Sequence, residues 1–160
     1  MDKMSRFEIT VSVVGAFVAT LAASFFSFSI LSVENNAMIL ASTGASAMLL
    51  FGMPASPASQ PWNLVAGHLI SAFVGVSCHL LMSNDLLAAS MAVPLAMLSM
   101  HWLRCLHPPG GATAVTAIIG GAHVHELGYL FLILPVLFNS VILLSFALAV
   151  GTLRKINPYE

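Results

Sequence analysis

Six apolar segments follow one another along the chain, separated by short polar or proline- and glycine-rich connections. They cover about residues 9–31, 37–52, 64–82, 86–104, 111–121 and 127–153. A helix needs about 20 mainly apolar residues to cross the hydrocarbon core of a membrane. At about 1.5 Å per residue the fifth segment is too short to span alone, and small polar residues interrupt the second. The pattern predicts an all-α integral membrane protein with four to six spans and two short or broken helices, at about 37–52 and 108–121.

Composition excludes a water-soluble fold. Hydrophobic residues make up 59% of the chain and charged residues 7%, with a mean hydropathy of +0.97, whereas soluble domains carry about a quarter charged residues. The net charge of −1 offers no basic tract for nucleic acid. The first apolar run is too long for the core of a signal peptide, so we interpret it as a retained span. Cys78 and Cys105 lie in or beside apolar segments, where we expect free thiols.

We expect a single transmembrane domain over residues 1–160, with no attached soluble domain. A weak internal echo divides it, because Gly44-Ala45-Ser46-Ala47 and Gly111-Ala112-Thr113-Ala114 each open a short apolar run that ends in glycine. Short or broken segments in matching positions of two halves are typical of a transporter's binding site. The echo suggests two loosely repeated halves, 1–82 and 83–160. Small-residue tetrads are also common in membrane helices, so the echo has a second explanation.

Positive residues flank the first and the last apolar segment. Lys3 and Arg6 precede the first, and Arg154 and Lys155 follow the last. Because positive flanks favour the cytoplasm, both termini are predicted to be cytoplasmic, which requires an even number of crossings. The connection 53–63 contains three prolines and no charged residue. We therefore expect it to fold back onto the protein.

Small residues recur at four-residue spacing in the third segment, at Gly67, Ser71 and Gly75. This spacing predicts a face that another helix can approach closely. Because 160 residues make a thin bundle, we expect a homo-oligomer, and this row offers one face for it.

The most unusual stretch is Leu106-His107-Pro108-Pro109-Gly110-Gly111-Ala112-Thr113-Ala114. The two prolines predict that the preceding helix stops near His107. Gly110 and Gly111 then leave backbone amides uncovered at the start of the next helix. A helix N-terminus carries about half a positive elementary charge and can bind an anion without any lysine.

Five polar residues are candidates near or within the apolar segments. Arg104 is either part of a cationic entrance to the amides or an interface arginine that reaches for phosphates. His107 could donate to an anion, shuttle a proton, or only cap the preceding helix through its carbonyl. Ser46 and Thr113 offer hydroxyls, with bonds inside their own helices as the alternative. Asn139 is costly in lipid, so it should face protein or a water-lined path.

The remaining histidines give weaker signals. His68 and His79 are expected to bond neighbouring helices in place of a metal. The run His123-Val124-His125-Glu126 lacks the helical spacing of a zinc site, and we expect an interfacial loop. No hydrolase or P-loop pattern is present. We therefore expect no enzymatic activity, no cofactor and no metal site.

Two long motifs resemble the HPP family of integral membrane proteins, which is named for its His-Pro-Pro. One is the stretch 106–114 just described; the other is Gly44-Ala45-Ser46-Ala47-Met48-Leu49-Leu50-Phe51-Gly52 with Pro54, Ser56, Pro57, Gln60, Pro61, Asn63 and Gly67-His68 behind it. The resemblance covers nearly the whole chain. Family members are usually described as having four spans, and plant and cyanobacterial relatives as moving nitrite. The resemblance therefore implies transport of nitrite or a similar small anion.

The sequence thus predicts a small-anion transporter or channel whose site is built on helix N-terminal amides. The expected anion-binding residues are His107, Gly110, Gly111, Thr113, Arg104, Gly44, Ser46 and Asn139. The expected partners are a small inorganic anion, the lipid bilayer and a second copy of the chain, and the expected location is a bacterial inner membrane. Two alternatives stay open: a membrane enzyme that uses histidines and a metal, and a non-transporting assembly or regulatory subunit.

Overall fold

The computed structural model describes residues 4–30 and 37–154, and these residues form helices without strands. Lys3 and Lys155 lie outside the described residues. The elements in chain order are α1 (Arg6–Ile30), α2 (Ala37–Gly52), η2 (Pro57–Ser59), α3 (Pro61–Leu81), α4 (Asp85–Trp102), α5 (Gly110–Ile119), α6 (Ala122–Leu127), η3 (Gly128–Leu132), η4 (Ile133–Leu137) and α7 (Phe138–Leu153). The all-α prediction is confirmed.

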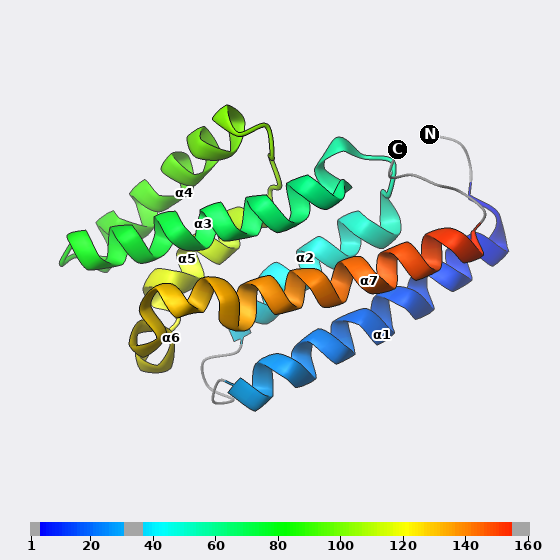
Figure 1. The fold of residues 1–160 in the computed structure, drawn as a ribbon, viewed down its shortest axis with the longest axis horizontal. Coiled ribbons are helices and arrows are strands. Elements are labelled where there is room, and N and C mark those ends of the chain that lie inside the picture. Colours follow the sequence, from blue (N-terminus) through cyan, green and yellow to red (C-terminus); the bar gives the residue numbers. More distant parts are fainter. Residues whose placement is uncertain (1–3, 31–36, 155–160) are drawn as a thin grey trace.

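The helices run back and forth along one bundle, so that α1, α2, α3, α4, α5 and α7 alternate in direction (Figure 1). The helix α1, the helix α3 and the composite stretch Ala122–Leu153 are long and apolar enough to cross a membrane. The helices α2 and α5 are shorter apolar helices, as predicted. The two ends of the described chain meet at one end of the bundle, where Arg154 Nη2 lies 3.8 Å from Met4 Sδ.

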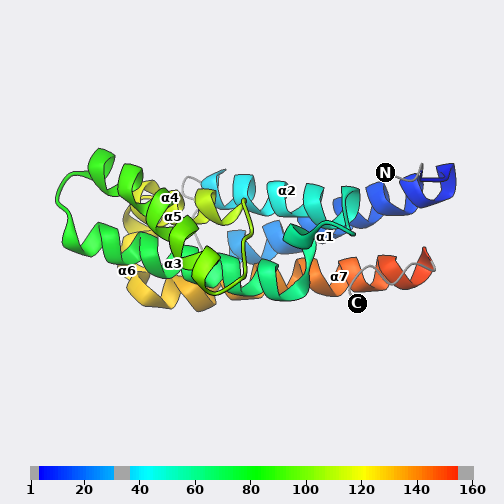
Figure 2. The ribbon, with the colours of Figure 1, turned by 90° about the horizontal axis from the view of Figure 1, so that it is seen from above.

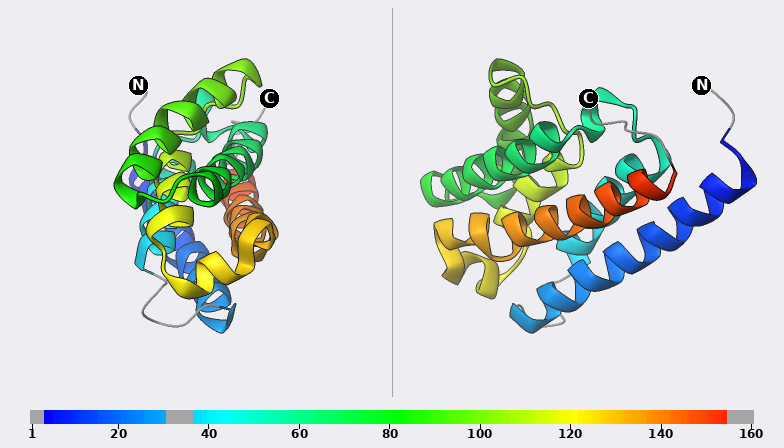
Figure 3. Two further views of the ribbon diagram at one scale, coloured as in Figure 1. Left: turned by 90° about the vertical axis from the view of Figure 1, so that its left-hand side faces the viewer. Right: turned by 45° about the vertical axis from the view of Figure 1, so that its right-hand side comes forward.

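The helices pack as two groups of three. The helices α1, α2 and α7 contact one another, and so do α3, α4 and α5. Figure 2 shows the two groups displaced along the long axis of the molecule, and Figure 3 shows that axis end-on and obliquely. The groups join where α2 meets α5 and where α3 meets α7. Each half of the chain therefore contributes helices to both groups.

Two helices bury only a narrow stripe of mostly small side chains. The helix α1 buries Ser12, Gly15, Ala19, Ala23 and Ser27, and α4 buries Ala88, Ala92, Ala96 and Met100. The rest of both helices exposes large apolar side chains, which include Phe17, Phe25, Leu86 and Met97. Apolar exposure on this scale is unfavourable in water and is matched by the acyl chains of a bilayer. The protein is an integral membrane protein.

Close approach of α3 and α5 depends on glycine. A Cβ atom at Gly75 would collide with the carbonyl oxygen of Ala114, and one at Gly67 would lie 2.6 Å from His107 Cβ. The prediction that another helix approaches this row is confirmed. The expectation that the row offers a face for an oligomer is wrong, because α5 and the chain before it already cover that face.

The last apolar segment is not one helix. Leu134, with φ −118° and ψ 110°, leaves the helical region, and the Leu134–Pro135 peptide bond is cis. A proline disfavours helical geometry in the residue before it and supplies no amide hydrogen of its own. The break separates α6 and η3, at one end of the bundle, from α7, which returns to the other end.

The helix α4 ends earlier than the sequence suggests, well before His107. Arg104 takes up the left-handed conformation with φ 52°. Its amide donates to the carbonyl of His101 at 3.2 Å, and the amide of Cys105 donates to the carbonyl of Met100 at 2.9 Å. This pair of bonds is the Schellman motif, which usually has glycine at the left-handed position. The turn, more than the two prolines, ends the helix.

Candidate functional site

The chain between α4 and α5 descends into the bundle alongside the first turns of α3. Trp62 Nε1 donates to the carbonyl of Leu103 at 3.3 Å, and Asn63 Nδ2 donates to the carbonyl of Leu106 at 3.0 Å. Gly110 then lies beside Ser71, well inside α3. The helix α5 therefore begins within the bundle and not at its end, which suits a helix too short to span.

The amides that open α5 are already bonded. The amide of Gly110 donates to the carbonyl of His107 at 2.9 Å, and that of Gly111 donates to the carbonyl of Pro108 at 3.0 Å. The two prolines bring no amide hydrogens and hold φ near helical values, so the chain forms a tight turn before α5. The prediction of an uncovered amide cluster is wrong, because this turn supplies its acceptors.

A cluster of buried hydroxyl and imidazole groups lies at the same place. Ser46 Oγ, on α2, lies 2.8 Å from His68 Nε2 and 3.0 Å from His107 Nε2. His68 Nδ1 lies 2.7 Å from Thr113 Oγ1, which lies 2.7 Å from Ser42 Oγ. All five residues are buried, and the two imidazole rings meet edge to face at 4.7 Å between centroids.

The connection between α2 and α3 anchors this cluster. His107 Nδ1 donates to the carbonyl of Ala58 at 2.7 Å. Ser59 is buried next to it and donates through Oγ to the carbonyl of Met53 at 2.8 Å. The prediction that the uncharged proline-rich connection folds back onto the protein is confirmed, and the fold brings one of its carbonyls to the site.

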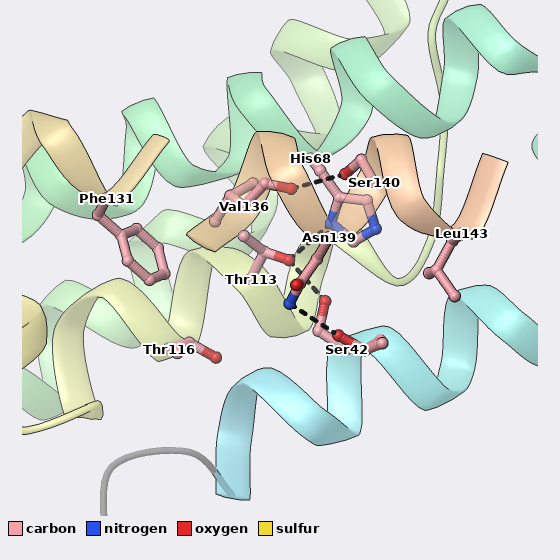
Figure 4. A pocket seen from close by; sticks show the side chains of 10 residues that line it. Ser42, His68, Thr113, Thr116, Phe131, Val136, Asn139, Ser140 and Leu143 are labelled. Carbon is pink, nitrogen blue, oxygen red and sulfur yellow. Dashed lines mark hydrogen bonds between the residues drawn. The ribbon is translucent and has the colours of Figure 1, made fainter. Parts of the chain in front are cut away.

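A small cavity opens on the other side of His68, between α2, α3, α5 and α7 (Figure 4). About 20 Å³ of it is open to a water-sized molecule, which is room for one ordered water. Seven of the ten residues that line it have polar side chains, and none carries a carboxylate, ammonium or guanidinium: Ser42, Thr43, His68, Thr113, Thr116, Phe131, Val136, Asn139, Ser140 and Leu143.

Asn139 closes the cavity from α7. Its Nδ2 donates to Ser27 Oγ at 2.7 Å and to Thr43 Oγ1 at 3.5 Å, while its buried Oδ1 has no hydrogen-bond partner. Hydroxyls both donate and accept. A carboxamide rotated by half a turn would therefore accept from the same two hydroxyls and direct its N–H groups toward the cavity. Asn139 can present either an acceptor or donors to a bound solute.

The structure brings together half of the expected site residues. Ser46, His107 and Thr113 belong to the buried cluster, and Asn139 lies across the cavity. The other four behave differently. Arg104 is exposed, Gly44 lines an open groove between α1 and α2, and Gly110 and Gly111 have no free amides.

Sequence reasoning missed several polar residues of the site and gave His68 a smaller role. His68 joins the cluster to the cavity, and Ser42, Thr43, Thr116 and Ser140 complete the polar lining. A buried ionisable residue inside a span is costly and therefore a signal of function, and His68 carried that signal. The hydroxyl residues carried none, because serine and threonine are common in membrane helices and bond to their own backbone.

A second group of histidines lies at the far end of the bundle. The rings of His79 and His125 stack with centroids 3.8 Å apart, and His125 Nε2 donates to the carbonyl of Ile118 at 2.7 Å. His79 Nδ1 has no hydrogen-bond partner and lies 3.8 Å from Asp85 Oδ1. Within residues 4–30 and 37–154, no three histidine, cysteine or acidic side chains are grouped so that they could hold a metal ion.

Comparison with known proteins finds a family and two related sequences. A family model described as the HPP transmembrane region matches residues 1–160. A transmembrane protein of Dictyostelium discoideum is 35% identical over 156 residues, which is 95% of this chain and 50% of that protein. A second transmembrane protein of the same organism is 36% identical over 126 residues, 76% of this chain and 44% of its own length. The chain thus spans about half the length of these relatives. No solved structure matches.

Proposed function

Because the chain belongs to the HPP family of transmembrane proteins, we propose that it is a transporter or channel for a small anion, and not an enzyme. Nitrite is the anion that the family resemblance implies. The observation that carries the proposal is a small cavity around which seven polar side chains gather, between helices that are otherwise strongly apolar. Polar groups at such depth are costly, and proteins keep them where a solute passes.

The arrangement of the helices supports the proposal. The first turns of α5 and the polar stretch of α2 meet at the cavity, where Thr113 lies 2.7 Å from Ser42. Transporters commonly form their sites where two short or broken helices meet near the middle of the membrane. Irregular backbone is tolerated there because it is buried in protein and its polar groups are satisfied. The chain between α4 and α5 meets both conditions.

Side chains, and not backbone amides, would hold the anion. A hydrogen bond to a charged group contributes about 1.5–3 kcal/mol, so two or three donors bind an anion weakly enough for release. Thr113 of α5 and Asn139 of α7 line the cavity from different helices (Figure 4). Each would donate to the anion by turning a hydrogen from its present acceptor, His68 or Ser27, toward the cavity. Since the cavity now has room for one water, entry of a triatomic anion requires the lining helices to move apart.

The test is nitrite uptake into liposomes that contain the purified protein. Thr113→Val keeps the shape of the side chain and removes its hydroxyl, and we expect uptake to fall on the order of tenfold, as the loss of one bond to a charged ion predicts. Thr10→Val is the control, because Thr10 is exposed on α1 and bonds only to the carbonyl of Arg6 at 2.9 Å. If Thr113→Val and Thr10→Val take up nitrite at the same rate, the cavity does not lie on the transport path.

Orientation, location and assembly are parts of the same proposal. Arg6 and Arg154 lie at one end of the bundle, and the positive-inside rule assigns this end to the cytoplasm. The two relatives come from Dictyostelium, so a bacterial inner membrane stays a prediction. Assembly into a homo-oligomer also stays a prediction, now without the face on α3.

A further inference from the structure

The carbonyl of Ala58 sets the direction of the hydrogen bonds in the buried cluster. A carbonyl only accepts, so His107 carries its proton on Nδ1 and, when neutral, presents a bare Nε2. The bare nitrogen must accept, and the group within reach is the hydroxyl of Ser46, 3.0 Å away. Ser46 has one hydrogen and two acceptors for it, His107 Nε2 and the carbonyl oxygen of Ser42, each 3.0 Å from Ser46 Oγ. Donation to His107 satisfies the bare nitrogen.

The remaining bonds then follow in the same direction. Ser46 Oγ accepts from His68, whose proton therefore lies on Nε2 and whose Nδ1 is bare. That Nδ1 accepts from the hydroxyl of Thr113, 2.7 Å away, and Thr113 in turn accepts from Ser42. Every hydrogen in the chain points from the cavity toward Ala58. Two imidazoles joined by one hydroxyl form a relay that can pass a proton.

The cavity also lacks a fixed charge to balance an anion. Its lining contains hydroxyls, one carboxamide, one imidazole and apolar side chains. The hydrogen-bond partners of the two imidazoles are Ser46 of α2, Thr113 of α5 and the carbonyl of Ala58 in the η2 connection, and none of these groups carries a charge. No ion pair involves either imidazole within the described part of the chain. The two imidazoles are therefore the groups that can supply a positive charge at this site.

We propose that each anion crosses together with one proton, which His68 exchanges with the cavity and passes through Ser46 to and from His107. The inference rests on the proposed transport function and adds its coupling. Burying an unpaired anion is strongly unfavourable, whereas an anion beside an imidazolium is a neutral pair. Transport by this route carries no net charge.

The proton balance of the relay closes in two states. Thr113 first turns its hydrogen from His68 Nδ1 toward the cavity. When Nδ1 of His68 then takes a proton from the cavity, Nε2 of His68 releases its proton to Ser46, and Ser46 passes its own hydrogen to His107 Nε2. His107 is then an imidazolium still bound to Ala58, and Ser46 now donates to His68. Return of the proton reverses each step and restores the starting state. One proton enters and the same number leaves.

The test uses wild-type protein in liposomes that contain a pH-sensitive dye, with membrane potential set separately by potassium and valinomycin. Protein-free liposomes give the background, because nitrous acid crosses lipid by itself. We expect one proton to enter with each nitrite, uptake that rises with external acidity, and rates that an imposed potential leaves unchanged. Nitrite uptake driven by potential, without acidification, would overturn proton coupling while leaving transport in place. Failure of wild type to move nitrite under either gradient would overturn the proposed function itself.

The relay is tested with a matched pair of buried serines. Ser46→Ala removes the hydroxyl that joins the imidazoles, and we expect uptake driven by the pH gradient to fall roughly tenfold and to lose its dependence on external pH. Ser71→Ala is the control: Ser71 is equally buried on α3, and its Oγ has only a weak contact of 3.8 Å to Met100 Sδ. If Ser46→Ala and Ser71→Ala couple nitrite uptake to the pH gradient equally well, the proton does not pass through Ser46. If Ser46→Ala fails to fold, the proton count of the wild type still decides the coupling.

Discussion

Gly110 and Gly111 are neighbours in the sequence and meet different surroundings. A Cβ atom at Gly110 would lie 2.5 Å from Ser71 Oγ and 3.1 Å from the carbonyl oxygen of Gly67, so α3 leaves no room for one. At Gly111 the nearest atom would be Val93 Cγ1 at 3.9 Å, an ordinary contact. One glycine is therefore required by packing, and the other is not.

This difference gives a direct prediction. Gly110→Ala should lower the free energy of unfolding by about 1–3 kcal/mol, as overpacking does. Gly111→Ala should raise it by about 0.5–1 kcal/mol, because alanine favours a helix. Thermal unfolding in detergent measures both. Gly111→Ala should also leave nitrite uptake unchanged, since its amide already bonds to Pro108. Loss of uptake in Gly111→Ala alone would restore the amide hypothesis.

At the scale of the element, the end of α4 depends on a residue in an unfavourable conformation. The left-handed conformation costs an L-residue other than glycine about 1–2 kcal/mol, and Arg104 adopts it with its side chain exposed. The turn it makes sends the chain back into the bundle toward His107. The backbone of Arg104 shapes the site even though its side chain is exposed and does not line the cavity.

Replacing Arg104 by glycine should therefore stabilise the protein. We expect Arg104→Gly to raise the free energy of unfolding by about 1 kcal/mol and to leave nitrite uptake within about twofold, because the guanidinium does not face the cavity. Arg154→Gly is the control: Arg154 has φ −76° and donates to the carbonyl of Phe51, so glycine should destabilise there. A large fall in uptake by Arg104→Gly would support the cationic entrance.

The apolar segments could be predicted from sequence because length and hydropathy alone select a membrane helix. The end of α4 could not, since an arginine gives no sign of a left-handed turn. Ser46, Thr113 and Asn139 stood out as polar residues in apolar segments. Their partners did not, because the bond from Ser42 to Thr113 joins helices distant in sequence and depends on how α2 meets α5.

At the scale of the whole molecule, the helices alternate in direction, and each half of the chain contributes three of them. Each helix of the first half therefore runs opposite to the corresponding helix of the second half. The helices α1, α3 and α5 run away from the end that holds the termini, and α2, α4 and α7 run back toward it (Figure 1). The two halves that the internal echo suggests would thus be inverted relative to each other, as in many transporters. The repeat itself stays a prediction.

The direction of the helices can be tested by labelling. Ala55 and Ser83 are exposed in connections at opposite ends of α3. Ala55→Cys and Ser83→Cys should therefore react with an impermeant maleimide from opposite sides of the membrane, and both should react after permeabilisation. The native thiols of Cys78 and Cys105 are buried, so the background should be low. Labelling of both positions from the same side would contradict the arrangement.

The hydrogen bond from His107 to Ala58 has a consequence for how the molecule could be controlled. The carbonyl of Ala58 belongs to the short connection between α2 and α3. It sets which nitrogens of the buried imidazoles donate hydrogen bonds and which accept them. Displacement of the connection, by an antibody fragment or an inhibitor bound to it, would free His107 to exchange tautomers and reverse every donor behind it. A ligand that never enters the pathway could in this way silence the protein from the end of the bundle that holds the termini.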